Sequence, residues 1–140
     1  MPSAAQMNAP LTQAPSAKLM ARQGETMSVQ LHLQLGAGYH VNSNTPSDEF
    51  LIPLKLTWDE SPFTPVGVEY PKGQLEKYSF SEKPLSVYTG DFEITAKLRV
   101  AASAPKGPGK LTGKVRYQAC TQTICLPPRS LAIQLPIEIR

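Results

Sequence analysis

Cysteine is scarce in this chain, with only Cys120 and Cys125 among 140 residues. A framework of several disulfides is therefore excluded, and a chain of this length can bury a sufficient core without one. Long apolar runs are also missing, since no segment approaches the roughly 18 to 20 apolar residues that span a bilayer. The N-terminus lacks a basic stretch followed by an apolar one, so we expect no signal peptide there and a soluble domain.

The charge pattern excludes several classes of partner and ligand. The formal net charge is +3, and the lysines and arginines are scattered, so we expect no nucleic acid binding. The acidic pairs Asp48-Glu49 and Asp59-Glu60 do not follow the calcium-loop pattern and are expected in solvated loops. No Ser-His-Asp signature, phosphate-binding loop or His-Glu-x-x-His motif occurs, so we expect no cofactor.

Proline and glycine are plentiful, with fourteen and nine residues, and they lie between apolar runs as turn residues do in all-β proteins. Within the runs, apolar and polar residues alternate with the period of a half-buried strand. The alternating runs are 27–35, 39–44, 52–58, 66–70, 92–100, 111–119 and 131–139. No convincing amphipathic helix accompanies them, so the sequence predicts an all-β, immunoglobulin-like antiparallel β-sandwich.

We place these runs in a single domain at residues 18–140. Residues 1–17 are mostly alanine, proline, glutamine and serine, and they predict a disordered leader. Pro53 predicts an edge position for the run 52–58. Residues 74–84 are polar and aromatic without a clear period, which predicts a loop.

Four residues separate Cys120 from Cys125, and a hairpin loop at 121–124 would bring the two cysteines face to face. Facing residues of antiparallel strands have Cα atoms roughly 4.5 to 5.5 Å apart, within the range of about 4.4 to 6.8 Å that a disulfide accepts. Cys120 has the opposite parity to Leu111 and Val115. The pattern therefore predicts that its sulfur points away from the core, where another protein's thiolate can reach it.

Three interpretations of this pair stay open from the residues alone. A redox centre and a passive hairpin clamp both fit the geometry. Closing so short a loop stabilises by roughly 2 kcal/mol, against about 5 kcal/mol for a loop of about a hundred residues, so a staple selected for stability alone would join distant strands. A zinc site made of both cysteines with His32 and His40 is the third interpretation, although its spacing matches no common zinc pattern.

The block 117–128, Tyr-Gln-Ala-Cys-x-x-x-x-Cys-Leu-Pro-Pro, resembles the redox motif of the N-terminal periplasmic domains of DsbD-type thiol:disulfide interchange proteins and related disulfide reductases. Two weaker blocks agree in order. The stretch 38–44 resembles the family's glycine-aromatic strand, and 52–58 followed by Tyr70-Pro71 resembles the next strands. The likeness runs from about Lys18 to the C-terminus, and the known members that are best characterised have five residues between the cysteines rather than four.

The resemblance implies an immunoglobulin-like domain with protein-disulfide reductase activity, in which Cys120 and Cys125 are the catalytic pair. In this family the cysteines receive electrons from a membrane-embedded part through a thioredoxin-like domain. They then reduce periplasmic thioredoxin-fold partners, such as disulfide isomerases and cytochrome c maturation factors. We therefore expect a monomeric periplasmic domain, either part of an inner-membrane protein or a stand-alone relative. Parity favours Cys120 as the sulfur that meets the partner and the family likeness favours Cys125, so both stay open.

The family also covers its cysteines with an aromatic cap loop until a partner docks. In this sequence the stretch 75–85 lies in the matching place, with Tyr78 and Phe80 as candidate cap residues; packing on the sandwich edge is the alternative for both.

Five other residues are weighed as site or structural residues. The resemblance places His40 beside the cysteines, where an imidazolium would lower a thiol pKa; the alternative is a half-exposed strand histidine without a role. Tyr117 is site-adjacent by the same motif. His32 lies on the polar face of its run and is expected on the surface, whereas Trp58 and Tyr70 fit core packing better than binding.

Overall fold

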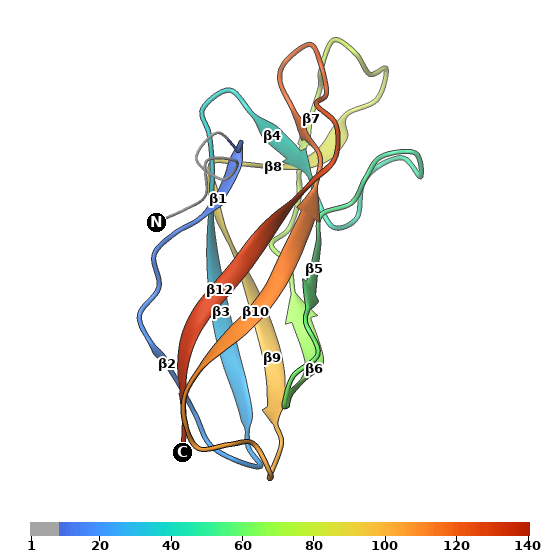
Figure 1. Ribbon diagram of the computed structural model, residues 1–140. Coiled ribbons are helices and arrows are strands. Elements are labelled where there is room, and N and C mark those ends of the chain that lie inside the picture. Colours follow the sequence, from blue (N-terminus) through green and yellow to red (C-terminus); the bar gives the residue numbers. More distant parts are fainter. Residues whose placement is uncertain (1–8) are drawn as a thin grey trace.

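The alternating runs form strands, and in the computed structural model, which describes residues 9–140, these strands build an elongated sandwich (Figure 1). This part of the chain contains no helix, and so none that could cross a membrane. The strands are β1 (Leu11–Gln13), β2 (Leu19–Ala21), β3 (Thr26–Leu35), β4 (His40–Asn42), β5 (Lys55–Trp58), β6 (Phe63–Glu69), β7 (Gln74–Glu76), β8 (Leu85–Thr89), β9 (Asp91–Val100), β10 (Gly107–Tyr117), β11 (Ala119–Cys120) and β12 (Arg129–Ile139). The predicted all-β, immunoglobulin-like fold class is confirmed.

Two of the sheets form the body of the sandwich. One has the order β1-β3-β9-β6 and the other the order β2-β12-β10-β5. Figure 1 shows β10 and β12 crossing in front of β3 and β9. Along β3 every second residue is buried, including Val29, Leu31 and Leu33, and the same alternation in β10 and β12 supplies the facing layer of the core. The period-2 pattern is therefore the direct cause of the two-layer core.

A third, smaller sheet lies at one end of the sandwich and has the order β11-β4-β8-β7 (Figure 1). The chain leaves β10 at Tyr117, passes Gln118 and enters this sheet as β11, which pairs with β4. The cysteines are therefore carried by a different sheet from the strand that precedes them. This change of sheet decides the geometry of the site.

The first strand was missed by the sequence pattern. The prediction of a disordered leader is wrong for Leu11–Gln13, because β1 pairs with β3 and Leu11 is completely buried. Residues 1–8 of that prediction lie outside the described residues. The loop predicted at 74–84 likewise contains β7. Each of these strands has three residues, which is too few for an alternation to be visible.

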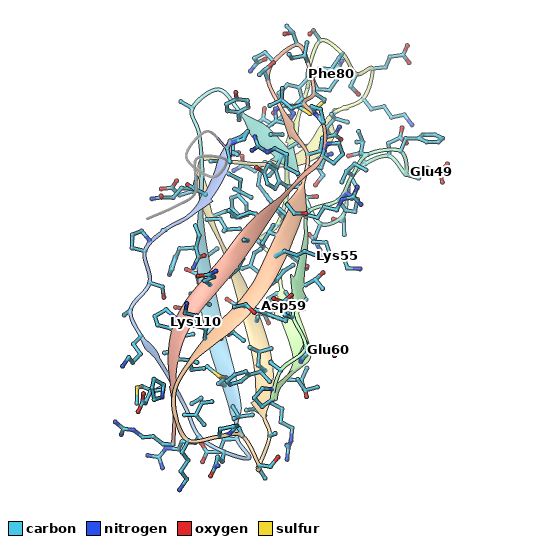
Figure 2. The ribbon with its side chains drawn as sticks, viewed as in Figure 1. Glu49, Lys55, Asp59, Glu60, Phe80 and Lys110 are labelled. Carbon is cyan, nitrogen blue, oxygen red and sulfur yellow. A yellow bond between two sulfur atoms is a disulfide. The ribbon has the colours of Figure 1, made fainter. Side chains whose placement is uncertain are left out.

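The expectations for the strand edge and the large aromatic residues are confirmed. β5 is the edge strand of its sheet, and Pro53 lies just before it. Trp58 and Tyr70 pack against the core, and the Tyr70 hydroxyl accepts a hydrogen bond of 3.1 Å from the Leu56 N–H. The four acidic residues weighed as calcium ligands are exposed, and Figure 2 labels three of them, Glu49, Asp59 and Glu60.

Replacing Gly113 with alanine is expected to lower the free energy of unfolding by about 1 to 3 kcal/mol. A Cβ atom there would lie 2.6 Å from the Thr57 carbonyl oxygen and 2.9 Å from the Trp58 ring, because β5 and β10 approach closely. Gly109→Ala in the same strand is the matched control, since its Cβ would meet only an Ile137 methyl at 3.7 Å. Denaturant titration measures the free energy of unfolding of both variants. Equal values for Gly113→Ala and Gly109→Ala would contradict the close approach of β5 and β10.

Candidate redox site

The two cysteines form a disulfide across a tight hairpin, with Cα atoms 3.9 Å apart. The Thr121 N–H donates to the Ile124 carbonyl oxygen at 2.7 Å, and the Leu126 N–H donates to the Ala119 carbonyl oxygen at 2.8 Å. The predicted face-to-face arrangement of the cysteines is confirmed, with the Cα atoms closer than the roughly 4.5 to 5.5 Å expected. Backbone hydrogen bonds on both sides of the pair hold the two sulfur atoms within bonding reach.

The two sulfurs differ in exposure. Cys120 is 2% exposed, whereas Cys125 is exposed on the hairpin. The prediction that Cys120 points outward is wrong. Its parity was counted along β10, but the strand is interrupted at Gln118, and after the interruption both Ala119 and Cys120 are buried. Cys125 is therefore the outer cysteine of the pair.

An aromatic loop, residues 77–84, joins β7 to β8 at the same end of the molecule. The Tyr78 ring stacks on the His40 ring with centroids 3.9 Å apart, and the Phe80 ring lies 5.6 Å from the Tyr78 ring. Figure 2 shows Phe80 at the end of the sandwich that carries the third sheet. The Ser79 hydroxyl donates a hydrogen bond of 3.1 Å to the Gln122 carbonyl oxygen in the cysteine hairpin. The aromatic loop is thus fastened to the hairpin that holds the disulfide.

The two cap candidates differ in burial. Tyr78 is 6% exposed and packs with Leu85 and Val87 in a small cluster separate from the main core, with Leu51 at its edge. Burial, with a smaller contribution from the Glu76 carboxylate, raises the pKa of Tyr78. Phe80 is 39% exposed. Tyr78 therefore anchors the aromatic loop, and Phe80 forms its outer surface.

His40 lies directly opposite Cys120 in the β4–β11 ladder and is 3% exposed. Burial lowers its pKa, because an imidazolium loses hydration in this position. His40 thus lies beside the cysteines, as the resemblance implies, but its burial disfavours the expected imidazolium. The alternative of a half-exposed histidine is wrong. The sequence could not show this burial, since the Tyr78 ring that covers His40 comes from a loop 38 residues further along the chain.

The remaining predicted site residues lie elsewhere. Tyr117 is 1% exposed in the hydrophobic core, where burial raises its pKa. His32 is on the surface as expected, with its Nδ1 3.1 Å from a carboxylate oxygen of Glu93. The residues weighed as zinc ligands are not gathered, because the sulfurs are bonded to each other and His32 is carried by a body sheet. Residues 9–140 contain no group of three or more His, Cys, Asp or Glu that could hold a metal ion.

A small cavity beside the hairpin was not anticipated from the sequence. It measures about 260 Å³, and its lining includes His40, Tyr78, Gln122, Gly38 and Gly90. Both glycines have positive φ angles, 84° and 67°, so a side chain at either position would be strained. A break in the alternation at Gly36 and Gly38 is the only signal that the sequence offers for this feature.

Fold and site together define an immunoglobulin-like domain that carries a hairpin disulfide at one end, with one cysteine exposed and one buried. The family model described as the N-terminal region of the thiol:disulfide interchange protein DsbD matches residues 8–136. The chain belongs to this family of thiol-disulfide exchange domains. No curated protein sequence matches it.

One solved structure agrees with this assignment at the level of the fold. The N-terminal periplasmic domain of ScsB from Proteus mirabilis is similar with a TM-score of 0.59 and 13% identity, over 89% of this chain and 44% of that one. The chain thus spans less than half the length of that structure. The N-terminal domain of DsbD from Neisseria meningitidis, in its reduced form, is also similar, with a TM-score of 0.49 and 17% identity over 76% of this chain and 74% of that one.

Proposed function

We propose that this domain relays reducing equivalents through the Cys120–Cys125 disulfide to thioredoxin-fold proteins of the periplasm. The observation that supports this most directly is the pairing of an exposed Cys125 with a buried Cys120 in a bond that joins residues only five apart. An exposed sulfur is open to attack, and a buried partner sulfur is held ready to re-form the bond. Membership of the DsbD N-terminal family supports the same chemistry.

The exchange uses two steps in each direction. A thiolate of the electron donor attacks the Cys125 sulfur, the Cys120–Cys125 bond breaks, and Cys120 leaves with the electron pair and takes up a proton. The donor's second thiolate then attacks the donor's first sulfur in the mixed disulfide, and Cys125 is released as a thiolate. The donor has been oxidised and the domain reduced to two thiols. In the reverse sequence Cys125 attacks the disulfide of the acceptor, and Cys120 resolves the mixed disulfide.

Membership of the family supports partners for both directions. The acceptors are proteins of the disulfide isomerase or cytochrome c maturation type, and the donor is a thioredoxin-like domain, in a parent protein of the inner membrane. The aromatic loop serves as a cap in this proposal. Support for the cap comes from the stacking of Tyr78 on His40 and from the hydrogen bond between Ser79 and Gln122.

A structural clamp is the rival function, and the burial of Cys120 favours it. The reduction potential of the disulfide distinguishes the two, because a relay must exchange electrons with thioredoxin-type centres. The expected value is about −270 mV or higher, whereas an inert structural disulfide lies below about −300 mV. Equilibration of the domain with defined ratios of a reduced and oxidised dithiol, read by alkylation of free thiols, measures it. A value below about −300 mV would assign the disulfide to the clamp.

A further inference from the structure

A buried ring nitrogen of His40, the residue opposite Cys120 in the β4–β11 ladder, has no partner. His40 Nε2 is fully buried and forms no hydrogen bond within residues 9–140. Buried polar atoms are nearly always hydrogen bonded, so an exception of this kind needs a reason. His40 is also directly opposite Cys120 in the antiparallel ladder, where Cβ atoms of facing residues lie about 4.5 to 5.5 Å apart. The side chains of His40 and Cys120 therefore start from facing positions on the same side of the two strands.

The surroundings of His40 leave Cys120 as the group best placed to use this nitrogen. The Tyr78 ring stacks on the imidazole from the aromatic loop, and on the other side of β4 the residue opposite His40 is Thr89, which does not titrate. Tyr39 lines the same cavity as His40. Neither of the two ion pairs found in the described part of the chain involves His40. Cys120 and the tyrosines are thus the titratable groups that face it.

We propose that His40 Nε2 accepts the proton of the Cys120 thiol in the step that re-forms the disulfide, an inference that rests on the proposed relay. In the disulfide, Cys120 carries no proton, which accounts for a nitrogen without a partner. When the pair is reduced, Cys120 gains an S–H group that can donate to Nε2. Nε2 is thus already in place to accept a hydrogen bond from Cys120 in the reduced protein.

Electron delivery ends with the transfer of one proton and the exchange of one disulfide bond. Cys125 is joined to the acceptor protein in a mixed disulfide, and the Cys120 thiol gives its proton to Nε2 as its sulfur attacks the Cys125 sulfur. The Cys120–Cys125 bond forms, the bond from Cys125 to the acceptor breaks, and the acceptor's sulfur leaves with the electron pair. The imidazolium then passes its proton to that thiolate or to water. The domain is oxidised and the acceptor reduced.

Burial of Cys120 makes such a base necessary, and burial of His40 keeps the base in its neutral form. A thiol in apolar surroundings has a raised pKa, so Cys120 forms little thiolate without help. Burial also lowers the pKa of His40, which keeps the imidazole neutral and able to accept a proton at neutral pH. As the pH falls through this lowered pKa, the imidazole becomes charged and the proton acceptor is lost.

The test uses the reduced 140-residue protein and the chromogenic disulfide dithiobis(nitrobenzoate). The reagent releases one coloured thiolate when Cys125 attacks it and a second when Cys120 resolves the mixed disulfide. We expect His40→Phe, which keeps a ring on Tyr78, to slow the second release about a hundredfold at pH 7 and to leave the first unchanged. His32→Phe, at the exposed histidine, is the matched control and should leave both unchanged. His40→Gln is a second variant that fills the site but accepts no proton near neutral pH.

The pH profile separates proton transfer from packing. In the unmodified protein the second release should be level between about pH 7 and 9, whereas in His40→Phe it should rise about tenfold per pH unit, because the sulfur must then ionise on its own. A second release slowed equally at every pH, or not slowed, would overturn the proposal. The unmodified protein's profile needs no variant, so misfolding of a variant leaves the proposal testable. Failure to reduce any thioredoxin-fold protein would instead count against the proposed relay.

Discussion

Replacing Cys120 with alanine is expected to trap the domain on its partner as a long-lived mixed disulfide. The remaining Cys125 is the exposed sulfur, and without Cys120 no second thiol is in place to resolve the bond. Turnover is expected to be abolished, because electron delivery requires both sulfurs. Incubation with an oxidised periplasmic thioredoxin-fold protein, followed by a non-reducing gel, shows the complex as a band that a reductant removes.

Cys125→Ala is the matched variant, since it leaves only the buried sulfur. Its complex should form at least ~10-fold more slowly than that of Cys120→Ala, because Cys120 is 2% exposed. The variant without either cysteine should form none. Faster trapping by Cys125→Ala would reverse the roles of the two sulfurs. The absence of a complex with either single variant would leave the relay without a basis.

Removing the aromatic rings of Tyr78 and Phe80 is expected to expose the thiols. In the double variant Tyr78→Ala, Phe80→Ala, the reduced protein should react with iodoacetamide about 10-fold faster, since reactivity follows thiolate access. The rings are stacked in series from His40 through Tyr78 to Phe80, and His40 is the neighbour of Cys120. Alkylation at several times, read by mass spectrometry, gives the rate.

Two controls separate the cap from general loosening. Leu75→Ala removes an apolar side chain that is 70% exposed on β7, and it should leave the rate unchanged. Phe80→Ala alone removes the outer ring while Tyr78 keeps its packing with Leu85 and Val87. It should give an intermediate rate. If the double variant reacts at the rate of the unmodified protein, Tyr78 and Phe80 do not cap the sulfurs.

The long strands of this domain were predictable because each carries enough alternations to be recognised. The run 27–35 became β3, and the runs 92–100 and 131–139 became β9 and β12, with bounds shifted by at most two residues at either end. Burial of one face is a property of each strand by itself, so the pattern survives in the sequence. The three-residue strands β1, β2 and β7 were not predicted, since their positions depend on the sheet edges that they join.

The site likewise has features that a local pattern predicts and features that depend on distant segments. The spacing of Cys120 and Cys125 was sufficient to predict a hairpin bond, because the partners are local. Parity failed for Cys120 because it assumes one uninterrupted strand, and the chain changes sheets at Gln118. The stacking of Tyr78 on His40 joins residues far apart in the sequence, so no local pattern could report it.

The sequence by itself determined a two-layer β-sandwich with one short-range disulfide, because strand alternation and cysteine spacing are local properties of the chain. Tertiary structure alone decided which cysteine is exposed, which histidine nitrogen is left without a partner and which ring stacks on that histidine. Each of these depends on β4, β11 and the aromatic loop meeting at one end of the sandwich. Packing of these distant segments buries Cys120 and His40, and that burial sets the chemistry of the thiol and the imidazole.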